Sequence, residues 1–230
     1  AMLTNYLKEK QKLLNEKEMN FYTPTGLHVY FQHPVENVDV EKVISKIESL
    51  MAPHLLDEIE MIVIGWFKEF EERSINAFYK DNAIYVSHLQ DDEEDLFDDL
   101  VHEISHSLEE AYGYQIYADE KIKNEFLRKR KYLHDILWKA GYRAPMSFFE
   151  DIEFNEEFDI FLHQKVGYDK LASLISGVFV SPYAATSLRE YFATAFTEYY
   201  LDSDHGFLKK VSPAVYEKIK MLQDTKELDY

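Results

Sequence analysis

The chain of 230 residues contains no cysteine, only seven glycines and only six prolines. Without cysteine it can form neither disulfides nor thiolate ligands, so histidine and carboxylate side chains are what remain for binding a metal. The small number of glycines and prolines leaves little room for low-complexity linkers. Hydrophobic residues make up 46% of the chain, enough for a buried core. We therefore expect one globular domain over residues 1–230.

Basic residues are also scarce, with 25 Lys and Arg against 43 Asp and Glu and a net charge of −18. This balance argues against nucleic-acid and anionic-membrane partners, because both bind basic surfaces. No segment approaches 18 continuous apolar residues, and the N-terminus lacks the basic-then-apolar pattern of a secretory signal. We expect a cytoplasmic chain with no membrane partner, or a secreted one if a signal has been removed. The oligomeric state stays open.

Two histidines four residues apart, His102 and His106, have the acidic residue Glu103 directly after the first. On an α-helix both imidazoles lie on one face and can reach a single Zn²⁺, the HExxH signature. Glu103 could then take a proton from the attacking water. The apolar residues form a stripe opposite the histidines: Leu96, Phe97, Leu100, Val101, Ile104 and Leu108. The pattern predicts metal-dependent amide hydrolysis, with a solvated polar face or a decayed site as the alternative.

A catalytic zinc site normally has three protein ligands, and no third histidine follows at short spacing. A carboxylate on a later helix is therefore expected, and the candidates are Glu190 and Glu198. Glu190 projects opposite the apolar stripe of its segment, whereas Glu198 lies on the flank of that stripe. This difference favours Glu190. Glu109 and Glu110 are candidates for orienting the imidazoles, or belong to an exposed acidic face.

The segment Tyr183–Phe196 resembles the closing motif of the anthrax lethal factor protease domain, whose core the Pro-Pro endopeptidases share. The similarity continues into Ser203-Asp204-His205 and covers the metal helix and about the last fifty residues. It implies that Tyr183, seven residues before Glu190, points at the metal and donates a hydrogen bond to the oxyanion. Thermolysin-like enzymes are weaker relatives, because this chain has Thr194 where they have Asp. The region between Gly113 and Pro182 is not covered, so substrate specificity is not carried over.

Elsewhere the chain alternates helical and extended patterns. We expect helices over Leu3–Glu18, Asp39–Met51, Ile116–Trp138 and Ile160–Val178, and strands over Leu27–Phe31, Ile59–Trp66, Phe78–Tyr79 and Ile84–Val86. Gly113 is expected to stop the metal helix. In zincins the strand before the metal helix is commonly an edge strand that pairs with an extended substrate. Here Ala83–Ser87 holds that position.

Together these features predict an α+β chain with a zincin-like metalloprotease fold. We expect an N-terminal helix (1–20), a small mixed sheet and metal helix (21–112), a helical insertion (113–182) and the third-ligand helix with a C-terminal helix (183–230). The predicted function is that of a zinc metalloendopeptidase of the gluzincin type, acting on a peptide or protein. The alternative is a catalytically inactive zincin-fold binding or scaffold protein, which would have no need of a base or an oxyanion donor.

From Asp81 to Glu120 the chain has no Lys or Arg, and acids crowd the metal helix and its approach. Acids in the first turn of a helix complement its dipole, which accounts for the earliest of them. It does not account for those farther along the helix. A negative potential there predicts a preference for basic peptides.

Overall fold

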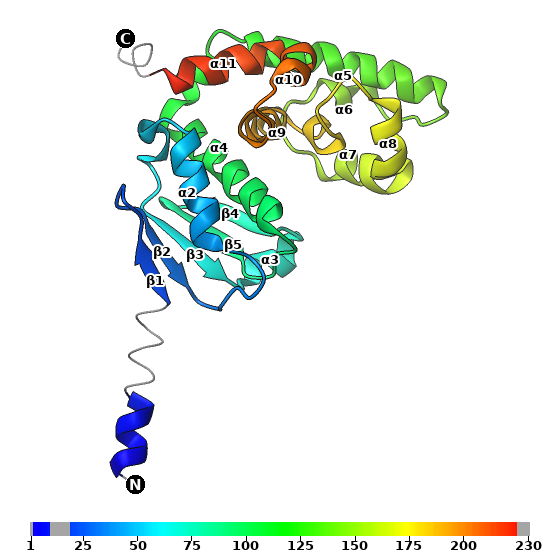
Figure 1. Cartoon of the computed structure of the whole chain (residues 1–230). Helices are drawn as coiled ribbons and strands as arrows, with labels where there is room; N and C mark the ends of the chain where they lie inside the picture. The colour runs from blue at the N-terminus through cyan, green and yellow to red at the C-terminus, as the bar shows by residue number, and fades with distance from the viewer. Residues whose placement is uncertain (1, 10–18, 225–230) are drawn as a thin grey trace. The chain divides into compact units, whose positions relative to one another are not determined.

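The computed structural model describes residues 2–9 and 19–224. The chain divides into two compact units, residues 1–107 and 108–230, and helix α4 (Glu93–Tyr117) runs through the boundary. A mixed sheet lies in the first unit, and the second is largely helical (Figure 1). The expected α+β class, a small mixed sheet followed by a largely helical part, is confirmed.

The sheet has the strand order β1-β2-β3-β5-β4. The strands are β1 (Asn20–Tyr22), β2 (His28–Phe31), β3 (Met61–Gly65), β4 (Ala77–Lys80) and β5 (Ala83–Ser87). The three central strands β2, β3 and β5 run parallel, and β1 and β4 pair antiparallel at the two sides. The predicted strands are present, whereas β1 was not predicted because its three residues are too short to show a pattern.

The expectation that Ala83–Ser87 is an edge strand is wrong. This segment is β5, which pairs with β3 on one side and with β4 on the other. Asp81 and Asn82 have φ angles of 50° and 65°. Two consecutive residues with positive φ form a tight hairpin turn whose twist matches that of the flanking strands. The chain therefore folds back after β4, and β5 pairs antiparallel with it. The edge of the sheet on this side is therefore β4.

Helix α2 (Val40–Leu50) connects the parallel strands β2 and β3. Asp39 caps it by accepting a hydrogen bond from the backbone N–H of Lys42 at 3.1 Å. Its buried face is Val40, Val43, Ile44 and Ile47, the 3.6-residue pattern that predicted it. Helices α2 and α4 lie over one face of the sheet (Figure 1), with the Lys46 ammonium 4.8 Å from the centroid of the Phe97 ring.

Helix α4 begins with Glu93, Glu94 and Asp95 in its first turn, where acidic side chains complement the helix dipole. The predicted apolar stripe is buried, each member 2% exposed or less. The predicted stop at Gly113 lies next to an observed break, because the backbone leaves helical geometry at Tyr112 (φ −125°, ψ 23°) and a kink there separates the histidine-bearing helix from a second helical stretch that ends at Tyr117. Between α4 and the next helix, Glu120 has a left-handed backbone conformation (φ 59°).

The second unit consists of helices joined by short connections. They are α5 (Lys121–Lys139), α6 (Met146–Glu150), α7 (Glu156–Ile160), the π-helical η2 (Phe161–Gly167), α8 (Tyr168–Leu174), the 3₁₀ turn η3 (Pro182–Ala185), α9 (Leu188–Leu201), α10 (Gly206–Val211) and α11 (Pro213–Gln223). Helix α9 packs against α5 and α11, which also contact each other. Residues 113–182 are largely helical, as predicted, and Glu190 lies on a helix. The single helix expected over Ile160–Val178 is wrong, because Gly167 (φ 85°) separates η2 from α8 and α8 ends at Leu174. Two short elements of the first unit, η1 (Pro53–Leu56) and α3 (Lys68–Arg73), were not predicted.

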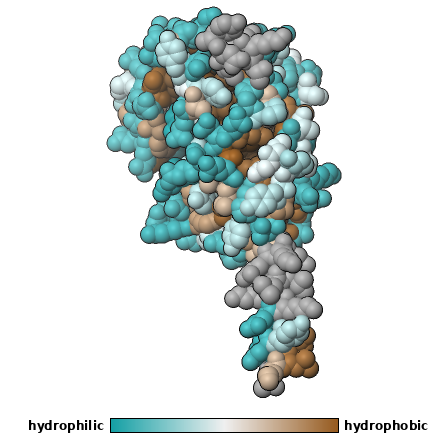
Figure 2. All heavy atoms as spheres, turned by 90° about the vertical axis from the view of Figure 1, so that its left-hand side faces the viewer, coloured by the Kyte–Doolittle hydropathy of each residue, from teal (hydrophilic) through white to brown (hydrophobic). Residues whose placement is uncertain are grey.

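Residues 2–9 form a helix whose side chains are exposed, and the remainder of the predicted N-terminal helix, residues 10–18, lies outside the described residues. On the face drawn in Figure 2, hydrophilic side chains predominate and apolar ones occur in scattered patches. Within residues 2–9 and 19–224, no helix combines the length and the apolar character needed to cross a membrane.

Candidate metal centre

His102 and His106 lie one turn apart on α4, with their ring centroids separated by 5.0 Å and their planes at 80°. Both rings are half-buried, and the carboxylate-bearing Glu103 between them is only 8% exposed. The side chains of Ser105 and Ser107 bond back to the carbonyl oxygens of His102 (2.5 Å) and Ile104 (2.6 Å). These bonds satisfy two buried hydroxyls within the helix.

Ligand atoms of His102, His106 and Glu190 all lie within 4.8 Å of one another. Among the residues that the structure describes, this is the one group of three or more histidine and acidic side chains with such a spacing. The sequence left Glu190 and Glu198 as candidates for the third position. The structure groups Glu190, and not Glu198, with the two histidines.

Glu190 lies in the first turn of α9, which Ser187 caps. The Ser187 hydroxyl oxygen accepts a hydrogen bond from the backbone N–H of Glu190 at 3.2 Å, and the N–H of Leu188 donates to the Ile152 carbonyl at 2.9 Å. A serine cap fixes where the helix starts, and hence the direction in which its first-turn side chains leave the axis.

Tyr183 lies in η3, just before α9, and is 40% exposed. Its carbonyl oxygen accepts from both the backbone N–H (3.1 Å) and the hydroxyl (2.7 Å) of Thr186. The backbone of this turn is therefore fixed while its tyrosine ring stays accessible. The predicted role of the hydroxyl as an oxyanion donor stays a prediction.

Arg130 is a residue that sequence reasoning missed. It lies on α5, is fully buried and has its guanidinium between the rings of Phe126 and Phe158, at 4.6 Å and 4.5 Å from their centroids. The guanidinium donates to four main-chain carbonyls, those of Ala185 (2.6 Å), Phe148 (2.8 Å), Thr186 (2.9 Å) and Asp151 (3.3 Å). Its five donors suit this geometry. Arg130 therefore ties the chain just after Tyr183 to α5 and to the α6 region.

A signal for Arg130 was present in the sequence. The buried residues Ile122, Phe126, Leu133 and Leu137 recur at helical spacing, and Arg130 occupies the same stripe. A charge on an apolar helix face is rarely tolerated without several hydrogen-bond acceptors. An arginine in such a stripe therefore predicts that its guanidinium donates hydrogen bonds to several buried carbonyl groups.

Glu109, a sequence candidate for orienting the imidazoles, accepts hydrogen bonds from Arg189 Nε (3.3 Å) and from the Tyr117 hydroxyl (3.2 Å). Burial, and after it the Glu109 charge, raises the pKa of Tyr117 above its ordinary value, so this hydroxyl stays protonated as a donor. Arg189 immediately precedes Glu190. Glu109 thus helps to hold the start of α9, whereas Glu110 is exposed.

Two acids on α4 precede the histidines. Burial raises the pKa of Asp99 to about 6, although a hydrogen bond from Gln90 Nε2 (3.1 Å) opposes the shift. Burial also raises the pKa of Asp98. These carboxyls therefore hold their protons more tightly than solvated acids do.

His205, which ends the segment similar to lethal factor, lies outside the three-residue group. Its Nε2 lies 2.8 Å from the carbonyl oxygen of Tyr199, and its ring stacks on the Tyr199 ring at 4.0 Å. It therefore caps the last turn of α9 instead of serving as a ligand there.

No protein-family model, curated protein or solved structure matches this chain.

Proposed function

We propose that the chain is a zinc-dependent metalloendopeptidase with a zincin-like fold, in which His102, His106 and Glu190 hold the metal. The observation that supports this is the grouping of their three ligand atoms within 4.8 Å. The placement of both histidines on one turn of a helix that follows the mixed sheet is consistent with it. So is the sequence similarity to the lethal factor protease domain.

The donor set fits a catalytic zinc ion. Two imidazoles and one carboxylate are a combination that catalytic zinc sites use, and three protein ligands leave a fourth position for water. In a tetrahedral site with bonds of about 2.0–2.1 Å, two ligand atoms lie about 3.3–3.4 Å apart. Atoms within 4.8 Å of one another reach that spacing through a small rotation of the side chains.

The remaining residues have separate roles. Bound zinc would supply Lewis acidity, lowering the pKa of a coordinated water toward about 7 and polarising the scissile carbonyl. The Glu103 carboxylate accepts a proton from the attacking water and then delivers it to the departing amide nitrogen. The Tyr183 hydroxyl donates a hydrogen bond to the carbonyl oxygen as negative charge develops on it.

Replacing the proposed general base, Glu103, tests catalysis separately from zinc binding. Glu103→Ala should keep its zinc, measured by elemental analysis, yet cleave a peptide library at least about 10²-fold more slowly than the wild type, since a general base contributes 10²–10⁴. Glu110→Ala is the matched control, because this acid is exposed on the same helix. Full activity of Glu103→Ala would contradict the mechanism. A zinc-loaded wild type that cleaves nothing would favour the inactive scaffold.

A further inference from the structure

A second pair of imidazoles, His33 and His88, lies in the first unit. Their ring centroids are 4.7 Å apart and their planes are inclined by 38°. The centroid separation is close to the 5.0 Å between His102 and His106. Two imidazoles bound to one ion through bonds of about 2.0–2.1 Å lie at separations of this size.

The backbone explains why two residues so far apart in sequence meet. His33 follows β2 and His88 follows β5, and β3 lies between those strands. The backbone N–H of His33 donates to the carbonyl of Ile64 (3.3 Å), and that of His88 donates to the carbonyl of Gly65 (3.0 Å). Strands two positions apart are about 10 Å apart. The two side chains therefore lean toward each other across the end of β3.

The loop that carries His33 is anchored at its start. Gln32 Oε1 accepts from the backbone N–H of Trp66 at 2.9 Å, with its side chain crossing over Gly65. A Cβ at position 65 would lie 2.1 Å from that oxygen, so glycine is required for this crossing. A fixed loop loses little conformational freedom when a ligand binds.

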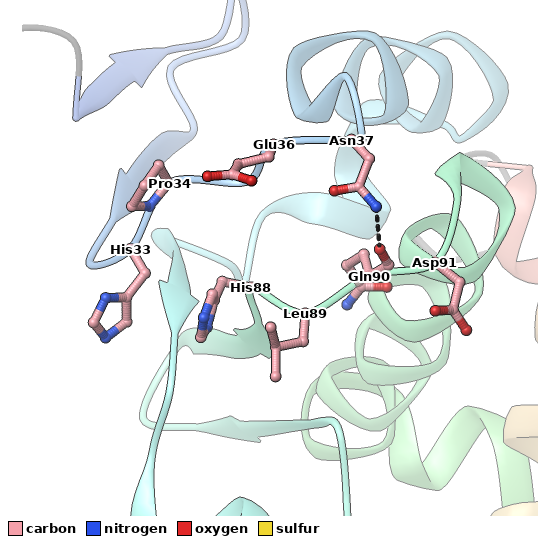
Figure 3. A pocket seen from close by; sticks show the side chains of 8 residues that line it. All are labelled: His33, Pro34, Glu36, Asn37, His88, Leu89, Gln90 and Asp91. Carbon is pink, nitrogen blue, oxygen red and sulfur yellow. Dashed lines mark hydrogen bonds between the residues drawn. The ribbon is translucent and has the colours of Figure 1, made fainter.

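The two rings border a pocket of about 470 Å³. They lie next to each other on one side of it, and Glu36, Asn37, Gln90 and Asp91 continue its lining (Figure 3). The second loop is fixed as well, because Asn37 Nδ2 donates to the Gln90 carbonyl (3.4 Å) and Gln90 Nε2 donates to the Ser87 carbonyl (2.9 Å).

His88 itself indicates a ligand. Its Nδ1 is buried and has no hydrogen-bond partner among residues 2–9 and 19–224. A buried polar nitrogen without a hydrogen-bond partner is unfavourable, because it has lost its contact with water and gained nothing in return. A cation coordinated at the imidazole pair would supply that partner, and the two carboxylates in the pocket lining would attract it.

We propose that His33 and His88 form a second binding site for a divalent transition-metal ion, distinct from the His102–His106–Glu190 group. Imidazole nitrogen selects zinc, copper and nickel over calcium and magnesium, and copper binds such ligands more tightly than zinc. With two protein ligands, water completes the coordination. The site does not depend on the proposed catalytic function.

The test uses the full chain with His102→Ala and His106→Ala, which removes the proposed catalytic site. Circular dichroism establishes that this double variant is folded. Titration with Cu²⁺ and Zn²⁺ in a calorimeter should show one remaining equivalent, with copper the tighter, and an excess of Ca²⁺ should not displace it. Adding His33→Ala or His88→Ala should abolish that binding.

His28→Ala is the matched control, because His28 lies on β2 in the same unit and stacks on Tyr22 at 4.4 Å. It should leave the remaining equivalent unchanged. An absence of binding in the double variant would overturn the proposal, as would binding that survives His33→Ala and His88→Ala or is displaced by Ca²⁺. Failure of the catalytic proposal would give a different result: the wild type would bind no more metal than the double variant that lacks His102 and His106.

Discussion

The Nε of Arg130 donates a hydrogen bond of 2.6 Å to the carbonyl oxygen of Ala185, two residues beyond Tyr183. The same guanidinium holds the carbonyl of Thr186 at 2.9 Å. These two bonds fix the backbone between the proposed oxyanion donor and the helix that carries Glu190. An arginine on a packing helix thus supports the geometry of two residues that are predicted to act on substrate and metal.

Arg130→Met should destabilise the protein substantially. The carbonyls of Ala185 and Thr186 lose their donor in a buried position, and two partly buried carbonyls lose it as well. At about 1–3 kcal/mol for each buried group left unsatisfied, we expect a loss of at least about 3 kcal/mol. For a chain of this size this corresponds to a fall in Tm of roughly 6–12 °C. Arg128→Met is the control, since Arg128 is exposed on the same helix. Equal Tm values for the two variants would contradict this role for Arg130.

The elements with strong periodicity could be predicted from the sequence. The apolar stripe of α4 and the Asp39-capped α2 follow from local patterns. The order of strands in the sheet could not be predicted, because pairing depends on contacts between distant segments. The turn residues Asp81 and Asn82 are a local feature, but the pairing of β5 with both β3 and β4, which leaves β4 at the edge, is not.

The candidate site also has features that the sequence predicts and features that it does not. The spacing of His102 and His106 and the helical phase of Glu190 depend on periodicity within single helices. The carbonyls that Arg130 holds come from two segments 18–56 residues away in sequence. The ion pair between Glu109 and Arg189 spans 80 residues. No local pattern in the sequence specifies such partners.

Asp99 should make the metal-free protein less stable as the pH rises. Its folded pKa of about 6 lies above that of an unfolded aspartate, about 3.9, so the folded chain binds more protons between these values. Stability from this group is therefore lost as the pH rises through that window and is constant above it. Asp99→Asn removes the effect and can still accept a hydrogen bond from Gln90.

Urea unfolding in the presence of a chelator measures this. The unfolding free energy of Asp99→Asn minus that of the wild type should be more positive at about pH 7.5 than at about pH 4.5. A difference that does not change with pH would show that the pKa of Asp99 is not raised.

Tyr183→Phe removes only a hydroxyl from an accessible ring. If that hydroxyl stabilises the oxyanion, kcat should fall by about 10²–10³, with zinc content and Tm unchanged. Tyr114→Phe provides the comparison, because Tyr114 is 82% exposed. A wild-type kcat for Tyr183→Phe would make Tyr183 a packing residue.

The acidic run at the start of α4 bears on substrate charge. Beyond the first turn, where the helix dipole no longer accounts for acids, Asp98 and Glu110 are exposed, whereas Glu109 is paired with Arg189 and contributes less to the field. We expect peptides with Lys or Arg near the scissile bond to have a higher kcat/KM than acidic ones, and this advantage should shrink with salt, since screening acts over about 8 Å at physiological ionic strength. A preference for acidic peptides, or no effect of salt, would leave the run as a solvated helix end.

The identity of the third ligand is tested most directly by zinc retention in two variants of the same helix. Glu190 lies in the first turn of α9 and groups with His102 and His106, whereas Glu198 lies two turns further along. In competition with a chelator, Glu190→Ala should release zinc at chelator concentrations that leave Glu198→Ala and the wild type fully loaded. If Glu198→Ala loses zinc and Glu190→Ala keeps it, the proposed metal centre is wrong.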